Sequence, residues 1–359
     1  MNKLGNADQA GLIVDKKIVA AGKDRHTGRY ALAMSVPQVT DLFAIAGAII
    51  RNIGFAAAAL MLGLNASVLS AQPALFHDHG HGLAFSSNGK ALLAPSHTGL
   101  AVYEDGVWSE AAGPIQGFSG FSVTRRAIYA SGHSTAGIPS GHEPVGLLRS
   151  LNGGETWQAI APALAGKADF RIMAASYGSN ALYVVNAEAN AAMPTAGIYR
   201  TDDEGKTWRR ASSRGLLGEI HGLAAHPSEA GVIAAATGRG LYLSLDGGEN
   251  FSVRDRKQPV TAVSFDTSGK SIRYARALSG EVIEAEFKGR GQKALRLPRL
   301  KRDYVTCLAQ NPKDERVLAF ATRRRDVYLT SDGGRTWRLI AEAGMTRGST
   351  ATETSRDSR

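Results

Sequence analysis

The chain has 359 residues, of which 43% are hydrophobic and 21% charged, and its formal net charge is +10 at pH 7. Its one cysteine, Cys307, excludes an internal disulfide, so the fold must form without one. Much of the positive charge lies in residues 288–302 and 323–325. Aromatic residues are absent from both stretches, which argues against a nucleic-acid surface.

The N-terminal region contains a candidate export signal. Residues 1–39 are polar, whereas residues 40–71 are apolar but interrupted by Arg51. A positive start at Arg51, an apolar stretch over 53–64 and small residues around 67–71 are the features of a signal peptide. On this interpretation the protein is exported, to the periplasm or the medium.

An uncleaved membrane anchor is the other interpretation of the same region. Residues 42–64 are near the roughly 20 residues that a membrane span requires. The short apolar stretch and the small residues at the expected cleavage site favour the signal peptide. On that interpretation, residues 1–50 are an over-long gene start. We expect membrane attachment only through this N-terminal signal or anchor.

An eight-residue motif repeats four times downstream. Each copy begins with Ser or Thr, carries Asp or Asn at its third position and Gly at its fifth, and ends on Trp or Phe. Such a sequence between two apolar runs predicts a hairpin turn, because Gly accepts positive φ and the short polar side chains bond to the turn backbone. The terminal ring is expected to be buried between neighbouring repeats. We call these copies the box loops: 150–157, 201–208, 244–251 and 330–337.

Short apolar runs around the box loops give four strands per repeat. The first strands are predicted at 82–85, 120–123, 172–175, 222–225, 260–265 and 305–308, and the second at 91–94, 127–130, 181–185, 232–235, 271–274 and 317–320. The first repeat has a shortened turn at 103–108, and we place a degenerate turn of the fifth repeat at 278–282. A period of roughly 40–50 residues is typical of propeller blades.

The predicted fold is therefore all-β: a six-bladed β-propeller with four-stranded antiparallel blades, over residues 72–343. Residues 1–71 form the N-terminal extension with the signal or anchor, and residues 344–359 a disordered polar tail. We expect a monomer.

The box loops resemble the Asp-box, or BNR repeat, of sialidases, sortilin-like receptors and photosystem assembly factors. In those families the box is a structural turn on the face away from the ligand. The chain also resembles exported bacterial Asp-box propellers commonly labelled glycosyl hydrolases, through the segments 81–85, 95–100, 102–108, 120–123 and 173–178. Since that label rests on the boxes, the resemblance implies the fold and leaves the activity open.

Propeller topology divides the loops between two faces. The box loops share one face, the box face, with the loops from first to second strand. The loops that enter each blade and those from second to third strand share the opposite, working face, where binding residues are expected. Candidates for binding an anionic small ligand or a protein partner there are Asp169, Glu219, His221, Arg239, Arg276 and Arg323.

Histidines suggest a metal site on the same face. His79 and His81 alternate, so on a strand they point to one side, about 6–7 Å apart. His97 or His133 could complete a site for Zn or Cu. The alternative is that these side chains only line the central channel and bond to backbone and water. The lack of a Cys or Met set weakens the case for Cu(I).

A sialidase-like enzyme is the second functional hypothesis. That chemistry uses three arginines to hold a carboxylate, with Tyr, Glu and Asp as reacting groups. The working face offers Arg239, Arg276, Arg323 or Arg324, Tyr304, Glu219 and Asp169. The Arg-Ile-Pro signature of sialidases is absent, so we assign no catalytic residue. Non-catalytic binding is the first hypothesis, and glycoside hydrolysis of acidic sugars the alternative.

Overall fold

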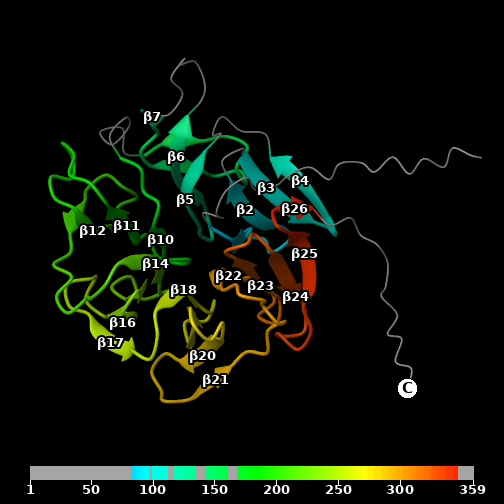
Figure 1. Ribbon diagram of the computed structural model, residues 1–359. Helices are drawn as coiled ribbons and strands as arrows, with labels where there is room; N and C mark the ends of the chain where they lie inside the picture. The colour runs from blue at the N-terminus through cyan, green and yellow to red at the C-terminus, as the bar shows by residue number, and fades with distance from the viewer. Residues whose placement is uncertain (1–81, 97–98, 112–116, 135–142, 161–167, 347–359) are drawn as a thin grey trace, which may run out of the picture. The chain divides into compact units, whose positions relative to one another are not determined.

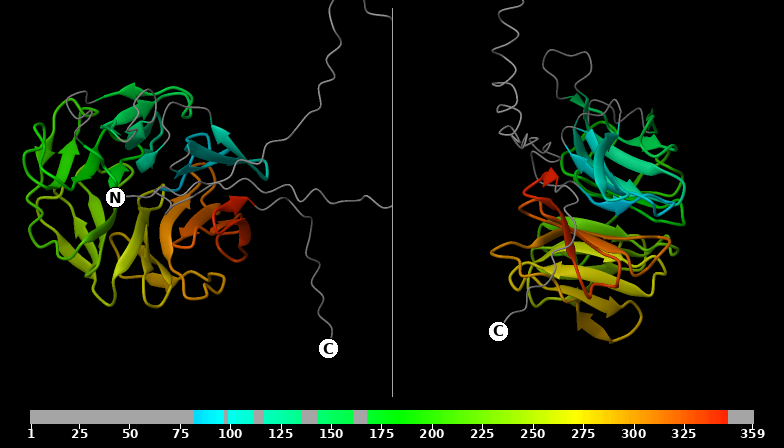
Figure 2. Two further views of the ribbon diagram at one scale, coloured as in Figure 1. Left: turned by 45° about the horizontal axis from the view of Figure 1, so that its top comes forward. Right: turned by 90° about the vertical axis from the view of Figure 1, so that its right-hand side faces the viewer.

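The computed structural model describes residues 82–96, 99–111, 117–134, 143–160 and 168–346. Their strands form six antiparallel sheets that succeed one another around a ring, as the colour gradient in Figure 1 and in the left view of Figure 2 shows. Each sheet is one blade, built from a continuous stretch of chain. The predicted six-bladed, all-β propeller is confirmed, and the described residues contain no α-helix.

The first three blades contain strands β1 to β13. Blade one consists of β1 (Ala84–Phe85), β2 (Leu92–Ser96), β3 (Gly99–Glu104) and β4 (Val107–Ala111). Blade two consists of β5 (Phe118–Val123), β6 (Ile128–Ser134), β7 (Glu143–Pro144), β8 (Leu148–Ser150) and β9 (Gln158–Ala159). Blade three consists of β10 (Met173–Ala175), β11 (Leu182–Asn186), β12 (Gly197–Thr201) and β13 (Arg209–Arg210).

The last three blades contain strands β14 to β26. Blade four consists of β14 (Ile220–Ala225), β15 (Ile233–Thr237), β16 (Gly240–Ser244) and β17 (Ser252–Asp255). Blade five consists of β18 (Val260–Phe265), β19 (Ser271–Arg276), β20 (Val282–Glu286) and β21 (Gln292–Ala294). Blade six consists of β22 (Val305–Gln310), β23 (Leu318–Thr322), β24 (Val327–Thr330), β25 (Arg338–Glu342) and β26 (Met345–Thr346).

Three details differ from the sequence prediction. Blade two gains the short strand β7, which pairs with β6, and blade six gains β26, beyond the expected end at residue 343. The prediction of the fifth repeat's turn at 278–282 is wrong, because residues 277–281 connect β19 to β20, the second and third strands of blade five. The connection from the third to the fourth strand is residues 287–291, whose Gly-rich sequence lacks the box pattern.

The four box loops are closed by their own side chains. The leading hydroxyl accepts a hydrogen bond from the N–H four residues on, at 2.9 Å in Ser150–Gly154, Thr201–Gly205 and Ser244–Gly248 and 3.1 Å in Thr330–Gly334. The side-chain oxygen of the third residue in each loop accepts a hydrogen bond from the backbone N–H of the seventh residue, at 2.9 to 3.0 Å. Side-chain hydrogen bonds, led by those from Thr201 and Thr207, lower the pKa of Asp203 to about 2.

The aromatic ring that closes each box loop packs at the interface with the preceding blade. Trp157, Trp208 and Phe251 join the clusters between blades one and two, two and three, and three and four. Trp337 lies between blades five and six, and Trp108 between blades six and one. Each ring thus packs between neighbouring repeats, as predicted, and so does Trp108 of the first blade, whose turn is shortened. Phe251 and Trp108 are buried, whereas the other three rings are half-buried.

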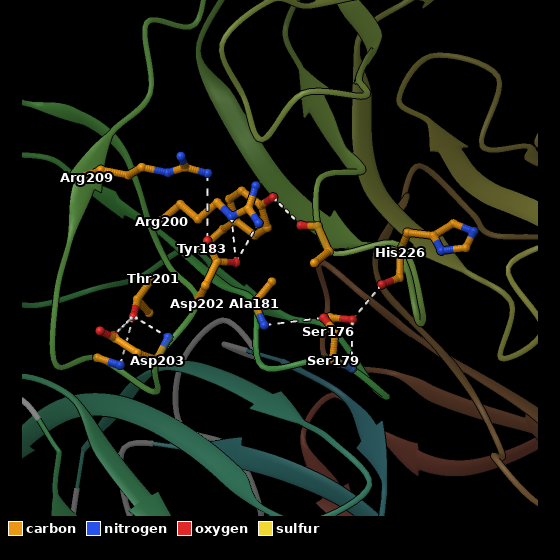
Figure 3. Close-up of polar contacts among 12 residues, drawn as sticks. Ser176, Ser179, Ala181, Tyr183, Arg200, Thr201, Asp202, Asp203, Arg209 and His226 are labelled. Atoms are coloured by element: carbon orange, nitrogen blue, oxygen red, sulfur yellow. Dashed lines mark hydrogen bonds and ion pairs between the residues drawn. The ribbon is translucent and has the colours of Figure 1, made fainter.

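Hydrogen bonds on the box face also join neighbouring blades. Figure 3 shows the join between blades three and four, where the Ser176 hydroxyl donates to the His226 carbonyl at 2.7 Å. Tyr183 donates to the Ala230 carbonyl at 2.6 Å. No helix among the described residues is long and apolar enough to cross a bilayer, and the N-terminal signal or anchor lies outside those residues.

Candidate functional site

The six inner strands surround a central channel of about 740 Å³. Each inner strand pairs with one neighbour only, so its other edge presents backbone N–H and C=O groups to the channel. Apolar side chains such as Phe121, Ile172 and Val263 line its wall. Cys307 also lies there, and burial raises the pKa of its thiol to about 11, so it is no thiolate nucleophile at neutral pH.

Polar residues from three blades line the working-face mouth of this channel. Arg171 precedes β10, Glu219 and His221 lie at the start of β14, and Tyr304 and Arg323 flank β22 and β23 of blade six. The face assignment is supported by backbone bonds between the two kinds of loop. Gly238 N–H donates to the Glu219 carbonyl and Arg323 N–H to the Tyr304 carbonyl, both at 3.0 Å. Three predicted binding residues, Glu219, His221 and Arg323, therefore line the mouth.

A recurring β-bulge shapes this mouth. The ladder between the first two strands shifts register at the working-face end in blades two, four, five and six. A bulge leaves one residue out of the ladder and re-aims its side chain. Two of these residues bond to the next blade: His221 Nδ1 lies 2.9 Å from the Val260 carbonyl, and the Thr261 hydroxyl donates to the Val305 carbonyl at 2.7 Å.

The bulge of blade two brings Asp169 and His133 together. The bulged Ser119 donates its hydroxyl hydrogen to Asp169 Oδ1. Asp169 Oδ2 lies 3.2 Å from Arg171 Nε and 3.9 Å from His133 Nε2. Asp169 is only 16% exposed, whereas Arg171 is 75% exposed. Asp169 therefore holds Arg171 at the channel mouth, and its carboxylate already has partners.

The structure places Arg276 away from the channel. Its guanidinium is buried against Asp255 of blade four, with Nη2 at 2.5 Å from Oδ2, and Nη1 lies 3.2 Å from Glu281. The Tyr274 hydroxyl donates to the same Asp255 oxygen at 2.7 Å. This cluster joins blades four and five. We therefore leave Arg276 out of the site that we propose below.

Arg239 is exposed on the working face but does not line the channel. Its side chain lies against Gly218, where an added Cβ would come within 2.8 Å of Arg239 Cγ and where φ is +88°. Gly is the residue that adopts such a φ without strain. Arg239 thus belongs to the surroundings of the mouth, on the loop beside Glu219.

The proposed metal site is mostly outside the described residues. His79, His81 and His97 lie there, and only His133 can be placed. Within the part of the chain that the structure describes, no three His, Cys, Asp or Glu side chains gather as metal ligands. The contact between His133 and Asp169 is a pair without a third ligand in these residues.

The carboxylates of the channel lining lie at opposite ends of the inner strands. Glu219 precedes β14 at the working face, whereas Asp266 follows β18 at the box face. The Asp266 side chain accepts hydrogen bonds from the Ser271 N–H at 2.8 Å and the Ser268 hydroxyl at 2.5 Å. Among the described lining residues, no second carboxylate stands beside Glu219 at the mouth.

Sequence reasoning missed Arg171, Ser119 and Thr261. Arg171 directly precedes the predicted inner strand of blade three, as Asp169 nearly does, and its place there was the available signal. Ser119 and Thr261 could not be singled out, because a polar residue near the start of an inner strand does not by itself indicate a bulge.

No protein-family model and no curated protein sequence matches the chain. Among solved structures, a GH74 enzyme of Niastella koreensis is similar with a TM-score of 0.51 and 15% identity, over 73% of this chain and 45% of the enzyme. A nidogen/laminin complex structure has a TM-score of 0.50 and 14% identity, over 67% and 88%. YCF48 bound to D1 peptide has a TM-score of 0.45 and 18% identity, over 75% and 82%.

These comparisons bear on the fold alone. The chain spans less than half of the length of the GH74 enzyme. An enzyme and a protein of a complex both resemble this chain at similar scores, so the shared β-propeller does not choose between catalysis and binding.

Proposed function

We propose that the protein is an exported, non-catalytic β-propeller that binds a carboxylate-bearing ligand or protein segment at the working-face mouth. The observation that carries the proposal is that Arg171, His221 and Arg323, from three different blades, line one channel mouth. Guanidinium groups bind carboxylates through two parallel N–H donors, which gives geometric selectivity as well as affinity.

The size of the channel suits this role. A volume of about 740 Å³ lies within the range of small-molecule sites, and the mouth adds polar groups to a wall that is partly apolar. The bulge contacts of His221 and Thr261 to the next blade fix the mouth in place. A rigid site loses little conformational entropy on binding.

Glycoside hydrolysis of acidic sugars is the second candidate. Tyr304 and Glu219 both line the mouth beside Arg323, which is the observation in its favour. Against it, only Arg171 and Arg323 of the described arginines line the channel, and Arg276 is committed to Asp255. Sialidase-like chemistry also needs an Asp beside the Tyr and the Glu, and the candidate Asp169 is bound to Ser119 and Arg171 and does not line the channel.

Calorimetric titration of the full chain with N-acetylneuraminate, galacturonate and a triglutamate peptide tests the proposal. Arg323→Gln should weaken binding at least about tenfold, since losing a charge-assisted hydrogen bond costs about 1.5–3 kcal/mol. Arg239→Gln, which removes an equally exposed arginine outside the lining, is the matched control. Equal affinities of the Arg323 variant and the wild type would contradict the proposal.

Two measurements separate the remaining alternatives. Release of 4-methylumbelliferone from glycosides of acidic sugars, abolished by Glu219→Gln, would establish the hydrolase instead. Metal analysis of the purified protein beside His79→Ala/His81→Ala tests bound Zn or Cu. Export is tested by fractionating the cells that express the chain.

A further inference from the structure

Five exposed cations form a strip on blades five and six, outside the channel. We call them the basic track: Arg296, Arg299, Lys301, Arg302 and Arg324. Four of them belong to the connection from β21 to β22, residues 295–304, and the fifth to the loop after β23. The proposed function uses only the mouth residues, so it assigns no role to these five positive charges.

The connection is held in place by its apolar residues. Leu295, Leu297 and Leu300 pack into the core cluster of blades five and six, while the cations between them are exposed. The Leu295 N–H donates to the Val282 carbonyl at 2.8 Å, and Trp337 Nε1 donates to the Arg296 carbonyl at 2.8 Å. Leucines therefore anchor the segment, and the basic side chains are presented to solvent from a fixed backbone.

Neighbouring carboxylates offset only part of the charge of the track: Asp303 lies within it, and Asp326 interacts electrostatically with Arg324. Lys288 and Lys293, just before it, pair with Glu229 and Glu284 at 2.9 Å each. None of the five track side chains has an ion pair with a described carboxylate. Asp303, which lies within the strip, accepts from the backbone N–H groups of Tyr304 at 2.8 Å and Arg324 at 3.3 Å.

One track residue is kept at a conformational cost. Arg302 has a φ of +53°, in the left-handed region that Gly and Asn adopt more readily. The Asp303 hydrogen bond to the Arg324 N–H joins this turn to the loop after β23, which makes the strip continuous across the two segments. Arg302 thus stands where Gly or Asn would strain the backbone less.

We propose that the basic track binds an acidic peptide segment of a partner protein, independently of what fills the channel. Four of its five cations are arginines, which suit carboxylates. The six residue steps from Arg296 to Arg302 span at most about 20 Å, the reach of some six extended peptide residues. Single-stranded nucleic acid would want aromatic platforms, and firm attachment to a membrane surface adds exposed apolar side chains to the basic charge. The track offers neither, because its leucines face the core.

Fluorescence anisotropy with labelled decaglutamate and the full chain tests the proposal. Neutralising Arg296→Gln/Arg299→Gln/Arg302→Gln should weaken binding roughly tenfold, since three exposed ion pairs contribute about 0.5 kcal/mol each. The matched control, Arg125→Gln/Arg126→Gln/Lys206→Gln, removes three exposed cations from the box face and should leave the affinity within twofold. Labelled triglutamate should bind more weakly than decaglutamate, because it covers half of the track.

A second variant separates binding from folding. Arg302→Asn removes one charge but suits the left-handed backbone, so its melting temperature should equal or exceed that of the wild type while decaglutamate binding falls. The proposal is overturned if both triple variants lose affinity equally, if decaglutamate does not bind at low salt, or if anionic phospholipid vesicles or oligothymidylate bind in preference. Arg171→Gln, on blade three, changes the mouth and not the track, so failure of the track and failure of the proposed function are distinguishable.

Discussion

Replacing Arg276 by methionine tests whether this residue is structural. Sequence analysis places Arg276 in a ligand site, whereas the structure buries it against Asp255, with side chains only 9% and 6% exposed. A ligand-binding arginine can be removed with little effect on folding stability. Removing one partner of a buried ion pair leaves the other charge without compensation and destabilises the fold.

The size of the effect follows from the hydrogen bonds that Asp255 would lose and keep. In Arg276→Met it loses the donors Nε and Nη2, at 3.2 and 2.5 Å. It keeps the Tyr274 hydroxyl at 2.7 Å and the Lys257 N–H at 2.8 Å. Breaking a buried pair costs about 3–5 kcal/mol. Because two donors remain, we expect the lower end, about 3 kcal/mol, which corresponds to a melting temperature lower by about 6–12 °C.

The pH dependence gives this prediction a second readout. Burial by itself would raise the pKa of Asp255, but the hydrogen bonds from Arg276, the Lys257 N–H and Tyr274 outweigh it and hold the pKa below its usual value. Asp255 therefore contributes stability that is present above the unfolded pKa of about 3.9 and is lost as pH falls through the lower folded pKa. Without the Arg276 guanidinium, we expect burial to raise the pKa of Asp255 above its unfolded value. The ionised carboxylate would then destabilise the fold at neutral pH. The difference in stability between wild type and variant should be largest near pH 7 and shrink toward pH 4.

Urea unfolding followed by tryptophan fluorescence at pH 7 and pH 4 measures both effects. Arg239→Gln, an exposed arginine of the same face, is the control and should unfold with the wild type. Adding Asp255→Asn to the Arg276 variant should restore part of the loss, because the two changes are coupled. An Arg276 variant that unfolds with the wild type but no longer binds carboxylates would refute the structural role and return Arg276 to the site.

Three further predictions concern the contacts within and between blades. Trp108→Phe removes the buried hydrogen bond from the indole to the sixth blade and should lower the free energy of unfolding by about 2 kcal/mol in urea. Gly269→Ala should give little soluble protein, because φ is +75° and the new Cβ would overlap the His226 ring; recovery equal to wild type would contradict this. In the box loop of blade six, Asp332→Ala should lower the melting temperature more than Asp332→Asn, since Asn152 fills that position in blade two. Hydrogen bonds lower the pKa of the Asp332 carboxyl, so its contribution is present above the unfolded value and should fade in melts as pH falls below about 4.

The blade architecture could be predicted because the same local chemistry repeats. The box loops fix the third and fourth strands, and every predicted inner strand overlaps a strand of the structure. The fifth blade is the exception, because the repeated local pattern is missing there. Its connection at 287–291 lacks a box, so the nearby Ser-Gly of 278–282 was the more turn-like sequence, and the prediction chose the wrong hairpin.

The sequence predicts on which face of the propeller a candidate site residue lies, but not which residue its side chain contacts. The order of strands and loops along the chain places Glu219 and Arg323 at the mouth, because counting the strands of each blade tells which loops lie on the working face. Whether a side chain reaches the channel depends on pairs between blades, some 20 to 50 residues apart, that no local pattern encodes. Arg276 is buried in an ion pair with Asp255 of the neighbouring blade. Asp169 accepts a hydrogen bond from Ser119 across another blade interface.

The contact between the first and last blades has a consequence for the order of folding. There, the bonds Trp108 to Ile340 and Asn311 to Gly89 join residues 232 and 222 positions apart, whereas Ser176 to His226 spans 50. Closing a chain loop some 4.6 times longer costs about 1.4 kcal/mol more in entropy. The ring is thus expected to close last on synthesis and to open first under load, as a C-shaped intermediate with five intact interfaces. A chain with new termini in the loop between blades three and four, and its old ones joined, would move this weakest interface to another pair of blades.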